Sequence, residues 1–266
     1  LCGVLPALSV EPQQTVTVDL GFTMDDIKEA AGVCDLTASD VYLNVNYVLK
    51  KVDGLLQAGD QVAYDQIALN VAELKAIDNS QTAGLPVYAK NEAAHVFSGV
   101  ISGEKNGKIV PWKAVFDQEK GALVSYVLGG KEMVSEPMMP CFGRAVTEND
   151  LGADLGKRLS GWLYPDFKVE NFEVKENGNN YEVAVKFSPI KVQAVNVAKK
   201  PMECVALLSL SFKVYADGTI EGVESMTDGG KLADCLTLPR FGMEFAMPGD
   251  YSVFEFYGKG PFENYS

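Results

Sequence analysis

Basic residues and long apolar runs are scarce in this sequence. It contains 23 lysines and arginines against 36 aspartates and glutamates, which gives a formal net charge of −13. A phosphate backbone or an anionic membrane surface would be repelled by this charge, so we expect no nucleic-acid and no membrane partner. The longest mostly apolar run, Cys204 to Leu210, is far below the roughly 18 residues that a membrane-spanning helix needs. A neutral ligand such as a sugar is compatible with the acidic field.

Cysteine and histidine are too few and too scattered to indicate a metal or redox site. The five cysteines show no C-x-x-C spacing, so we expect buried free thiols instead. His95 is the only histidine. A metal site or a Ser-His-Asp triad would have to be built around it alone, so we expect it on the surface. The cysteines are Cys2, Cys34, Cys141, Cys204 and Cys235.

Helical periodicity is nearly absent, whereas period-two alternation recurs from the start of the chain. A short helical turn is expected at 24–31, and residues 41–50 give the clearest strand. A second strand is expected over 61–69, with a bulge near Asp65, because the apolar parity changes there. Short strands separated by turn signals favour an immunoglobulin-like sandwich over residues 1–75.

The second half of the chain predicts a larger antiparallel sandwich. Residues 76–91 have weak periodicity and the composition of a linker. Strands resume over residues 92–266, where apolar side chains alternate with polar ones between turn signals. The clearest alternating sets are Trp112, Ala114 and Phe116; Tyr181, Val183, Val185 and Phe187; Ala206, Leu208, Leu210, Phe212 and Val214; and Phe241, Met243, Phe245 and Met247.

A β-prone run breaks abruptly close to residue 266. Gly258 and Gly260 permit positive φ, Pro261 stops ladder pairing, and Glu263 and Asn264 can then hold irregular backbone through local hydrogen bonds. A domain seldom ends inside such a motif, so we expect the 266 residues to be a piece of a longer polypeptide. Missing strands would leave an unpaired edge or an uncovered apolar face.

Several of these segments, in the same order, resemble the bacterial β-galactosidases of glycoside hydrolase family 2. Residues 59–66 are similar to the closing strand of the immunoglobulin-like domain that follows the catalytic barrel of that family. Two departures are Val146 and Glu148, where the family commonly has Pro and Asp. The segments that resemble its last sandwich domain are Phe116-Asp117-x-x-x-Gly121-x-Leu123, Arg144-Ala145-x-Thr147-Glu148-Asn149-Asp150, Trp162, Arg240-x-Gly242 and Tyr257-Gly258-x-Gly260-Pro261-x-Glu263-Asn264-Tyr265.

The resemblance implies an all-β chain: an immunoglobulin-like sandwich followed by an incomplete, galactose-mutarotase-like supersandwich. The parent enzyme would hydrolyse terminal β-D-galactosyl residues with retention, using two glutamates of a barrel upstream. No residue here matches those glutamates, so this chain alone is expected to be inactive. It would hold no metal or cofactor, and any magnesium or sodium ion of the parent would belong to the barrel. The expected partners are that barrel and a galactoside, and a homo-oligomer is possible. The expected location is the periplasm or cytoplasm of a bacterium.

The segment 144–156 is the candidate functional loop, because it combines a fixed cation, consecutive polar side chains and two glycines. By resemblance, Asn149, Asp150 and Gly152 help to close the galactoside pocket, Glu148 keeps the charge of the motif, and Arg144 anchors the loop. The equally weighted alternative is that Arg144 pairs with an acid only to order a long loop. The remaining motif residues, Arg240, Gly258, Gly260, Pro261, Glu263 and Asn264, are expected to be structural.

Two other function classes compete with this interpretation. A free-standing carbohydrate-binding module would recognise glycans without cutting them, and Trp112 and Trp162 could stack on a sugar face. Their apolar neighbours favour packing instead. A sugar-epimerising enzyme on the same sandwich would need a general acid and a general base, usually with histidine, and the lone His95 argues against it.

Overall fold

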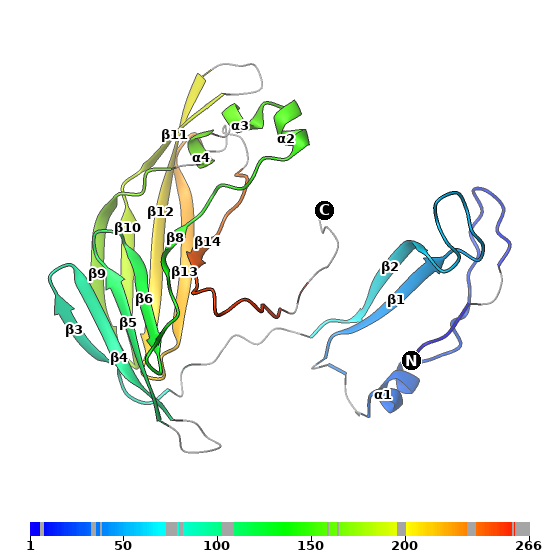
Figure 1. Ribbon diagram of the computed structural model, residues 1–266, viewed down its shortest axis with the longest axis horizontal. Coiled ribbons are helices and arrows are strands. Elements are labelled where there is room, and N and C mark those ends of the chain that lie inside the picture. Colours follow the sequence, from blue (N-terminus) through cyan, green and yellow to red (C-terminus); the bar gives the residue numbers. More distant parts are fainter. Residues whose placement is uncertain are drawn as a thin grey trace. The chain divides into compact units, whose positions relative to one another are not determined.

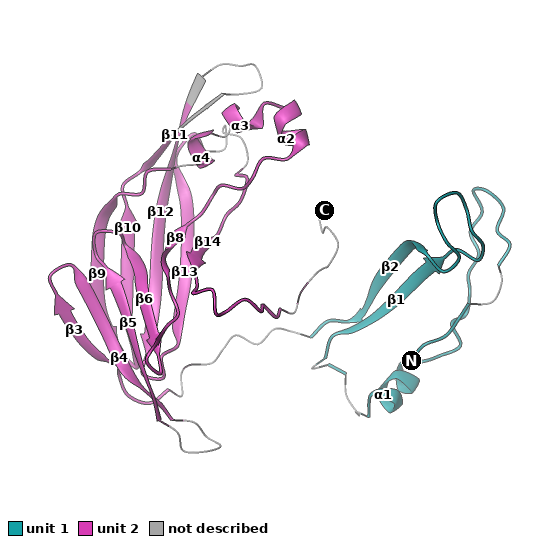
Figure 2. Ribbon diagram, in the orientation of Figure 1, with its two compact units in different colours: residues 1–78 teal, residues 79–266 magenta. Residues whose placement is uncertain are grey.

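The computed structural model divides the chain into two compact units, Leu1–Asp78 and Asn79–Ser266 (Figure 2). Antiparallel strands dominate, which confirms the all-β prediction. Within the described part, no helix has the length and apolar character needed to cross a membrane. The residues described are 1–5, 8–32, 36–37, 39–72, 79, 82–102, 109–158, 160–163, 165–195, 201–232, 238–256 and 258.

The helical turn expected in the first unit is present as α1 (Met24–Ala31). It begins at Thr23, whose hydroxyl oxygen accepts from the Asp26 backbone N–H, while the Asp26 carboxylate accepts from the Thr23 N–H at 2.6 Å. This reciprocal capping satisfies two backbone donors that the first turn would otherwise leave unpaired. The helix ends at Gly32, which has a φ of 68°. Such a left-handed residue is the usual helix stop.

Strands β1 (Val41–Val48) and β2 (Gln61–Asn70) pair antiparallel, but the predicted bulge lies elsewhere. Asp65 pairs regularly with Val45, and the register shifts instead at Val62 and Leu69. The change in apolar alternation near Asp65 therefore predicts a bulged strand correctly, but it does not give the positions of the bulges. Among the described residues of this unit β1 and β2 form the only sheet, so its immunoglobulin-like form stays a prediction.

The second unit is built from two antiparallel sheets that lie face to face (Figure 1). One has the order β14-β8-β6-β5-β4-β3, with β7 beside β6, and the other contains β9 to β13 with β12 at its centre. The bounds are β3 (Val87–Asn91), β4 (Ala94–Ser102), β5 (Ile109–Asp117), β6 (Ala122–Leu128), β7 (Lys131–Glu132), β8 (Glu136–Pro140), β9 (Val169–Asn177), β10 (Asn180–Phe187), β11 (Ile190–Val195), β12 (Pro201–Tyr215), β13 (Ile220–Gly230) and β14 (Met243–Ala246). The predicted linker 76–91 is wrong over its last five residues, because 87–91 forms β3 and pairs with β4.

The core lies between the two sheets and contains the alternating residues of β5 and β12. Burial of each leucine, valine or phenylalanine side chain among them contributes roughly 1.5–3 kcal/mol. Trp112 is 2% exposed and Trp162 1%, so both pack inside and neither presents a ring face to a sugar. Trp112 Nε1 donates to the Ala216 carbonyl at 3.1 Å in the turn after β12. Gly218 in this turn has a φ of 84°, and a Cβ there would lie 2.9 Å from Tyr126 Oη.

The surface position expected for His95 is wrong. His95 lies on β4 and is 4% exposed, because it shares the inward face of the strand with Phe97. Its Nε2–H donates to Gln118 Oε1 at 3.2 Å, and the Tyr88 hydroxyl donates to its Nδ1 at 2.8 Å. Both ring nitrogens are therefore satisfied within the fold, as a buried polar side chain requires.

The cysteines also depart in part from expectation. Cys204 is fully buried but disulfide-bonded, so the prediction of a free thiol is wrong there. Cys2 and Cys141 are free thiols, but Cys2 is exposed and Cys141 only half-buried. Cys34 and Cys235 lie outside the described residues.

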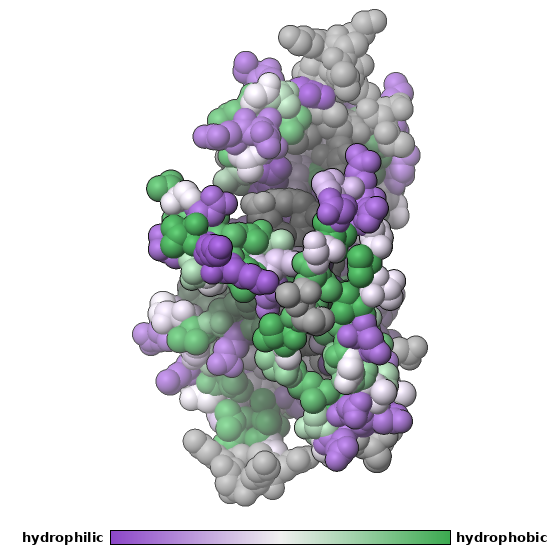
Figure 3. Space-filling model, turned by 90° about the vertical axis from the view of Figure 1, so that its right-hand side faces the viewer, coloured by the Kyte–Doolittle hydropathy of each residue, from purple (hydrophilic) through white to green (hydrophobic). Residues whose placement is uncertain are grey.

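Hydrophobic side chains are exposed on β14 and on the segment that follows it. Phe245 is 45% exposed, Phe254 83% and Phe256 64%. On the face that Figure 3 presents, hydrophobic residues are interspersed with hydrophilic ones. In the described part of the chain β14 pairs only with β8, so its other edge is free to pair.

Candidate functional site

The candidate loop, residues 144–156, is the first part of a helical insert between β8 and β9. The insert contains α2 (Glu148–Gly152), α3 (Leu155–Arg158) and α4 (Ser160–Leu163), which lie together at one end of the sandwich (Figure 1). Helix α2 begins at Thr147, whose hydroxyl oxygen accepts from the Asp150 N–H at 3.3 Å. The sequence predicts a loop here, because helices this short show no periodicity. The Thr-x-x-Asp spacing was the available signal.

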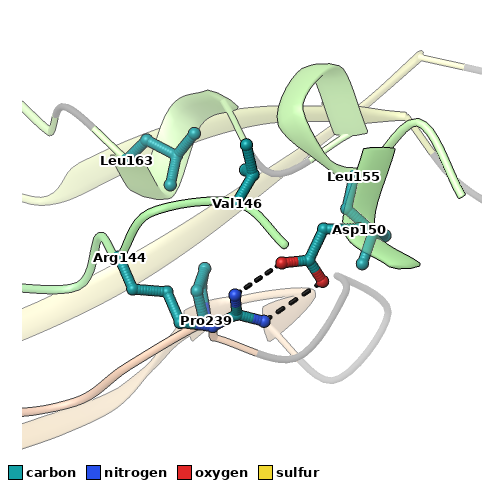
Figure 4. A pocket seen from close by; sticks show the side chains of 6 residues that line it. All are labelled: Arg144, Val146, Asp150, Leu155, Leu163 and Pro239. Atoms are coloured by element: carbon teal, nitrogen blue, oxygen red, sulfur yellow. Dashed lines mark hydrogen bonds and ion pairs between the residues drawn. The ribbon is translucent and has the colours of Figure 1, made fainter. Parts of the chain in front are cut away.

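Arg144 and Asp150 form a two-point ion pair that holds α2 against the chain leaving β8 (Figure 4). Arg144 Nη1 donates to Asp150 Oδ2 at 2.5 Å, and Nη2 donates to Oδ1 at 3.1 Å. The Thr147 backbone N–H also donates to Oδ2, at 2.8 Å. The hydrogen bonds from Arg144 and then Thr147 lower the pKa of Asp150 to about 2. Asp150 is thus an ionised side chain whose two oxygens are both occupied.

A small pocket lies beside this ion pair, but it is too small for a sugar. Its volume is about 10 Å³, which is room for about one water molecule. Ligand pockets usually measure roughly 300–1,000 Å³. The pocket is lined by Arg144, Val146, Asp150, Leu155, Leu163 and Pro239 (Figure 4).

The residues of the insert that face solvent are those around Asp150 rather than Asp150 itself. Glu148, Asn149 and Gly152 are exposed, and Leu151 is 62% exposed. A Cβ added to Gly152 would meet nothing within 4 Å, and the backbone of Gly152 is not left-handed. Leu151 is not among the predicted site residues, and a single apolar side chain within a polar run is no signal of a contact by itself.

The insert is seated on an aromatic cluster. Phe142 is 1% exposed and meets Trp162 edge to face, with ring centroids 6.0 Å apart. It also stacks on Phe241 at 5.9 Å and contacts Phe167 at 5.7 Å. A Cβ on Gly143 would lie 3.0 Å from the Leu163 carbonyl oxygen, so the chain after Phe142 packs closely on α4. The base of the insert is therefore fixed even though its tip is exposed.

Arg240 links Glu244 of β14 to Cys141, which follows β8. It donates to Glu244 at 2.7 Å and to Cys141 Sγ at 2.7 Å. Among the described residues no group of three or more histidine, cysteine, aspartate or glutamate side chains could hold a metal ion. Gly258 is described but Gly260, Pro261, Glu263 and Asn264 lie outside the described residues, so the structural role predicted for this motif stays a prediction.

These features define a two-sheet antiparallel sandwich with a short helical insert at one end. A family model described as "Beta galactosidase small chain" matches residues 107–266, which is well over half of the chain. The chain therefore belongs to the beta-galactosidase small chain family.

Relatives named beta-galactosidase match nearly the whole chain. The protein from Halalkalibacterium halodurans is 26% identical over 97% of this chain and 22% of its own length. The one from Priestia megaterium is 26% identical over 84% of this chain and 19% of its own length. A beta-galactosidase of Bifidobacterium adolescentis is 26% identical over 95% of this chain and 22% of its own length. The chain thus spans about a fifth of the length of these curated relatives.

Proposed function

We propose that this chain is a non-catalytic C-terminal part of a β-galactosidase that hydrolyses terminal β-D-galactosyl residues. In this proposal the sandwich supports the catalytic barrel, and the insert contributes to the rim of its active site. The observation that carries the proposal is the extent of the match. Relatives with that name cover almost all of this chain, yet the chain accounts for only about a fifth of each of them.

The acidic residues support a role without bond cleavage. A retaining glycosidase needs two carboxyl groups about 5 Å apart, one of them ready to give up a proton. Asp150 is tied to Arg144 and Thr147, so it cannot serve as the acid. Glu224 has a pKa raised to about 7 by burial alone. It pairs with Leu210 of β12 and is partly buried, and no cation or second carboxyl group contributes to the shift of its pKa.

The ion pair supports a positional role for the insert. Arg144 holds α2 through Asp150, and α2 in turn presents Glu148, Asn149 and Leu151 to its surroundings. In this proposal Asp150 positions the segment, while the exposed residues make the contacts at the rim. Gly152 follows them directly and leaves the backbone freer to move than any other residue would.

Turnover by the isolated chain is the first test. Incubation with a chromogenic β-galactoside should give no product above that of a buffer blank. Robust turnover by a clean preparation would refute the non-catalytic role.

Gly152→Ala in the full-length β-galactosidase tests the role at the rim. Alanine fits at this position without a clash, so the isolated chain should keep its melting temperature. We expect turnover and inhibitor affinity to change in the full-length enzyme, because the rim would need backbone freedom at this residue. Gly249→Ala is the matched control, since a Cβ there also meets nothing within 4 Å. Unchanged kinetics in Gly152→Ala would show that the rim does not need backbone freedom at this residue.

A further inference from the structure

The sheet of the first unit has one face built mainly from amide and tyrosine side chains. Between their two register shifts, β1 and β2 pair regularly from Tyr42 to Tyr47 of β1 (Figure 1). Side chains alternate between the two faces along a strand, and directly opposed residues share a face. We call one face of this regular part the amide face. Its residues are Tyr42, Asn44 and Asn46 of β1 and Tyr64, Gln66 and Ala68 of β2.

The opposite face of the same sheet carries the apolar side chains. Leu43 and Val45 alternate with the asparagines of β1 and are half-buried, and Ile67 lies opposite Leu43. All six residues of the amide face are exposed, Tyr42 by 39% and Tyr64 by 48%. An antiparallel sheet commonly has one apolar face towards a core and one polar face towards solvent. The amide face is therefore the solvent side of this sheet.

The centre of the amide face is a pair of amide side chains. Gln66 Nε2 donates to Asn44 Oδ1 at 2.9 Å across the two strands. Each carboxamide has two N–H donors and an oxygen that accepts. The bond therefore leaves the amide nitrogen of Asn44 as a donor and the amide oxygen of Gln66 as an acceptor at the surface. A sugar hydroxyl group both donates and accepts, so it matches this pair.

The two tyrosines lie at opposite ends of the amide row. Tyr64 is opposite Asn46, four residues along β1 from Tyr42. At about 3.4 Å per residue, the two tyrosines are about 14 Å apart along the strand direction. An exposed tyrosine offers an apolar ring that can stack on the C–H face of a sugar and a hydroxyl for its polar edge. Two rings at this separation fit an oligosaccharide rather than a single sugar ring.

The charge of the amide face favours a neutral partner. None of its six residues is charged, and the net charge of −13 disfavours an anionic glycan. A protein partner fits less well, because protein interfaces usually have an apolar centre and the centre here is the Asn44–Gln66 pair. We propose that the amide face binds a neutral oligosaccharide. The site itself requires only neutral sugar hydroxyls, and the expectation that the sugar is galactose rests on the proposed function.

Titration of the whole 266-residue chain with galactotetraose, a neutral β-linked tetrasaccharide, tests the amide face. We expect the side-chain amide signals of Asn44 and Gln66 to shift in nuclear magnetic resonance spectra. The double variant Tyr42→Ala, Tyr64→Ala should bind at least about fivefold more weakly, because it loses both stacking rings. Tyr47→Ala is the matched control and should keep the affinity, since Tyr47 is 49% exposed on the opposite face of the same sheet.

A second titration, with the neutral glucose tetrasaccharide cellotetraose, separates this inference from the proposed function. Binding of either sugar that the double variant weakens and Tyr47→Ala leaves intact supports the amide face. Binding of cellotetraose alone supports the face and removes its link to galactose. Binding of neither sugar at millimolar concentrations, or equal weakening by Tyr47→Ala, overturns the inference. If the double variant does not fold, the unaltered chain decides: the inference fails if sugar leaves the side-chain amide signals of Asn44 and Gln66 in place.

Discussion

Phe142→Ala removes the side chain on which the helical insert rests. Phe142 is 1% exposed and contacts three other aromatic rings, those of Trp162, Phe167 and Phe241. Truncation of a buried phenylalanine costs about 3–5 kcal/mol, since both the burial and the filled volume are lost. The three ring contacts favour the upper part of this range, because aromatic pairs add about 0.5–1.5 kcal/mol each.

The expected cost converts into a readily measured change of melting temperature. For a unit of this size, each kcal/mol lowers the melting temperature by about 2–4 °C. Phe142→Ala should therefore lower the melting temperature of the second unit by about 6–20 °C. Thermal unfolding followed by near-ultraviolet circular dichroism measures this, because it reports the packing of the aromatic rings. The fluorescence of Trp162 should shift to longer wavelength in the folded variant as water reaches the ring.

Phe245→Ala is the matched control, since it deletes the same side chain from a site that is 45% exposed. About half of the burial is at stake there, so the cost should be about 1 kcal/mol. If Phe142→Ala lowers the melting temperature by no more than Phe245→Ala does, the aromatic cluster does not support the insert.

Two further predictions concern pH. The hydrogen bonds of Arg144 and Thr147 lower the pKa of Asp150 from 3.8 to about 2; the stabilisation is present above about pH 4 and is lost as the pH falls towards 2. Asp150→Asn should therefore lower the melting temperature at pH 6 and have a smaller effect near pH 2, and an equal loss at both would contradict this. Burial raises the pKa of Glu224 from 4.5 to about 7, so its contribution is present below about pH 4.5 and is lost as the pH rises through 7. Glu224→Gln, which cannot ionise, should raise the melting temperature at pH 8 more than at pH 5; an equal effect at both values would refute the assignment.

The sequence by itself determined the class of fold and the position of several strands in the second unit. Alternation at period two identified β5 and β12, because a strand between a core and solvent must place apolar side chains on one face. The ordered motifs indicated the β-galactosidases, and the match over residues 107–266 confirms that family. The fold class, the strand positions and the family can be predicted because each depends on a local sequence pattern, which is the same whatever packs against it.

Only the tertiary structure decided how the polar residues are used. His95 is buried because β4 points it inward, with Tyr88 and Gln118 supplied from other parts of the chain. Asp150 proved to be the partner of Arg144, six residues away, and Asn79 is held by residues about 100 and 142 positions later in the sequence. A hydrogen bond between distant residues leaves no periodic trace in the sequence. It exists only once the sheets have brought the two groups together.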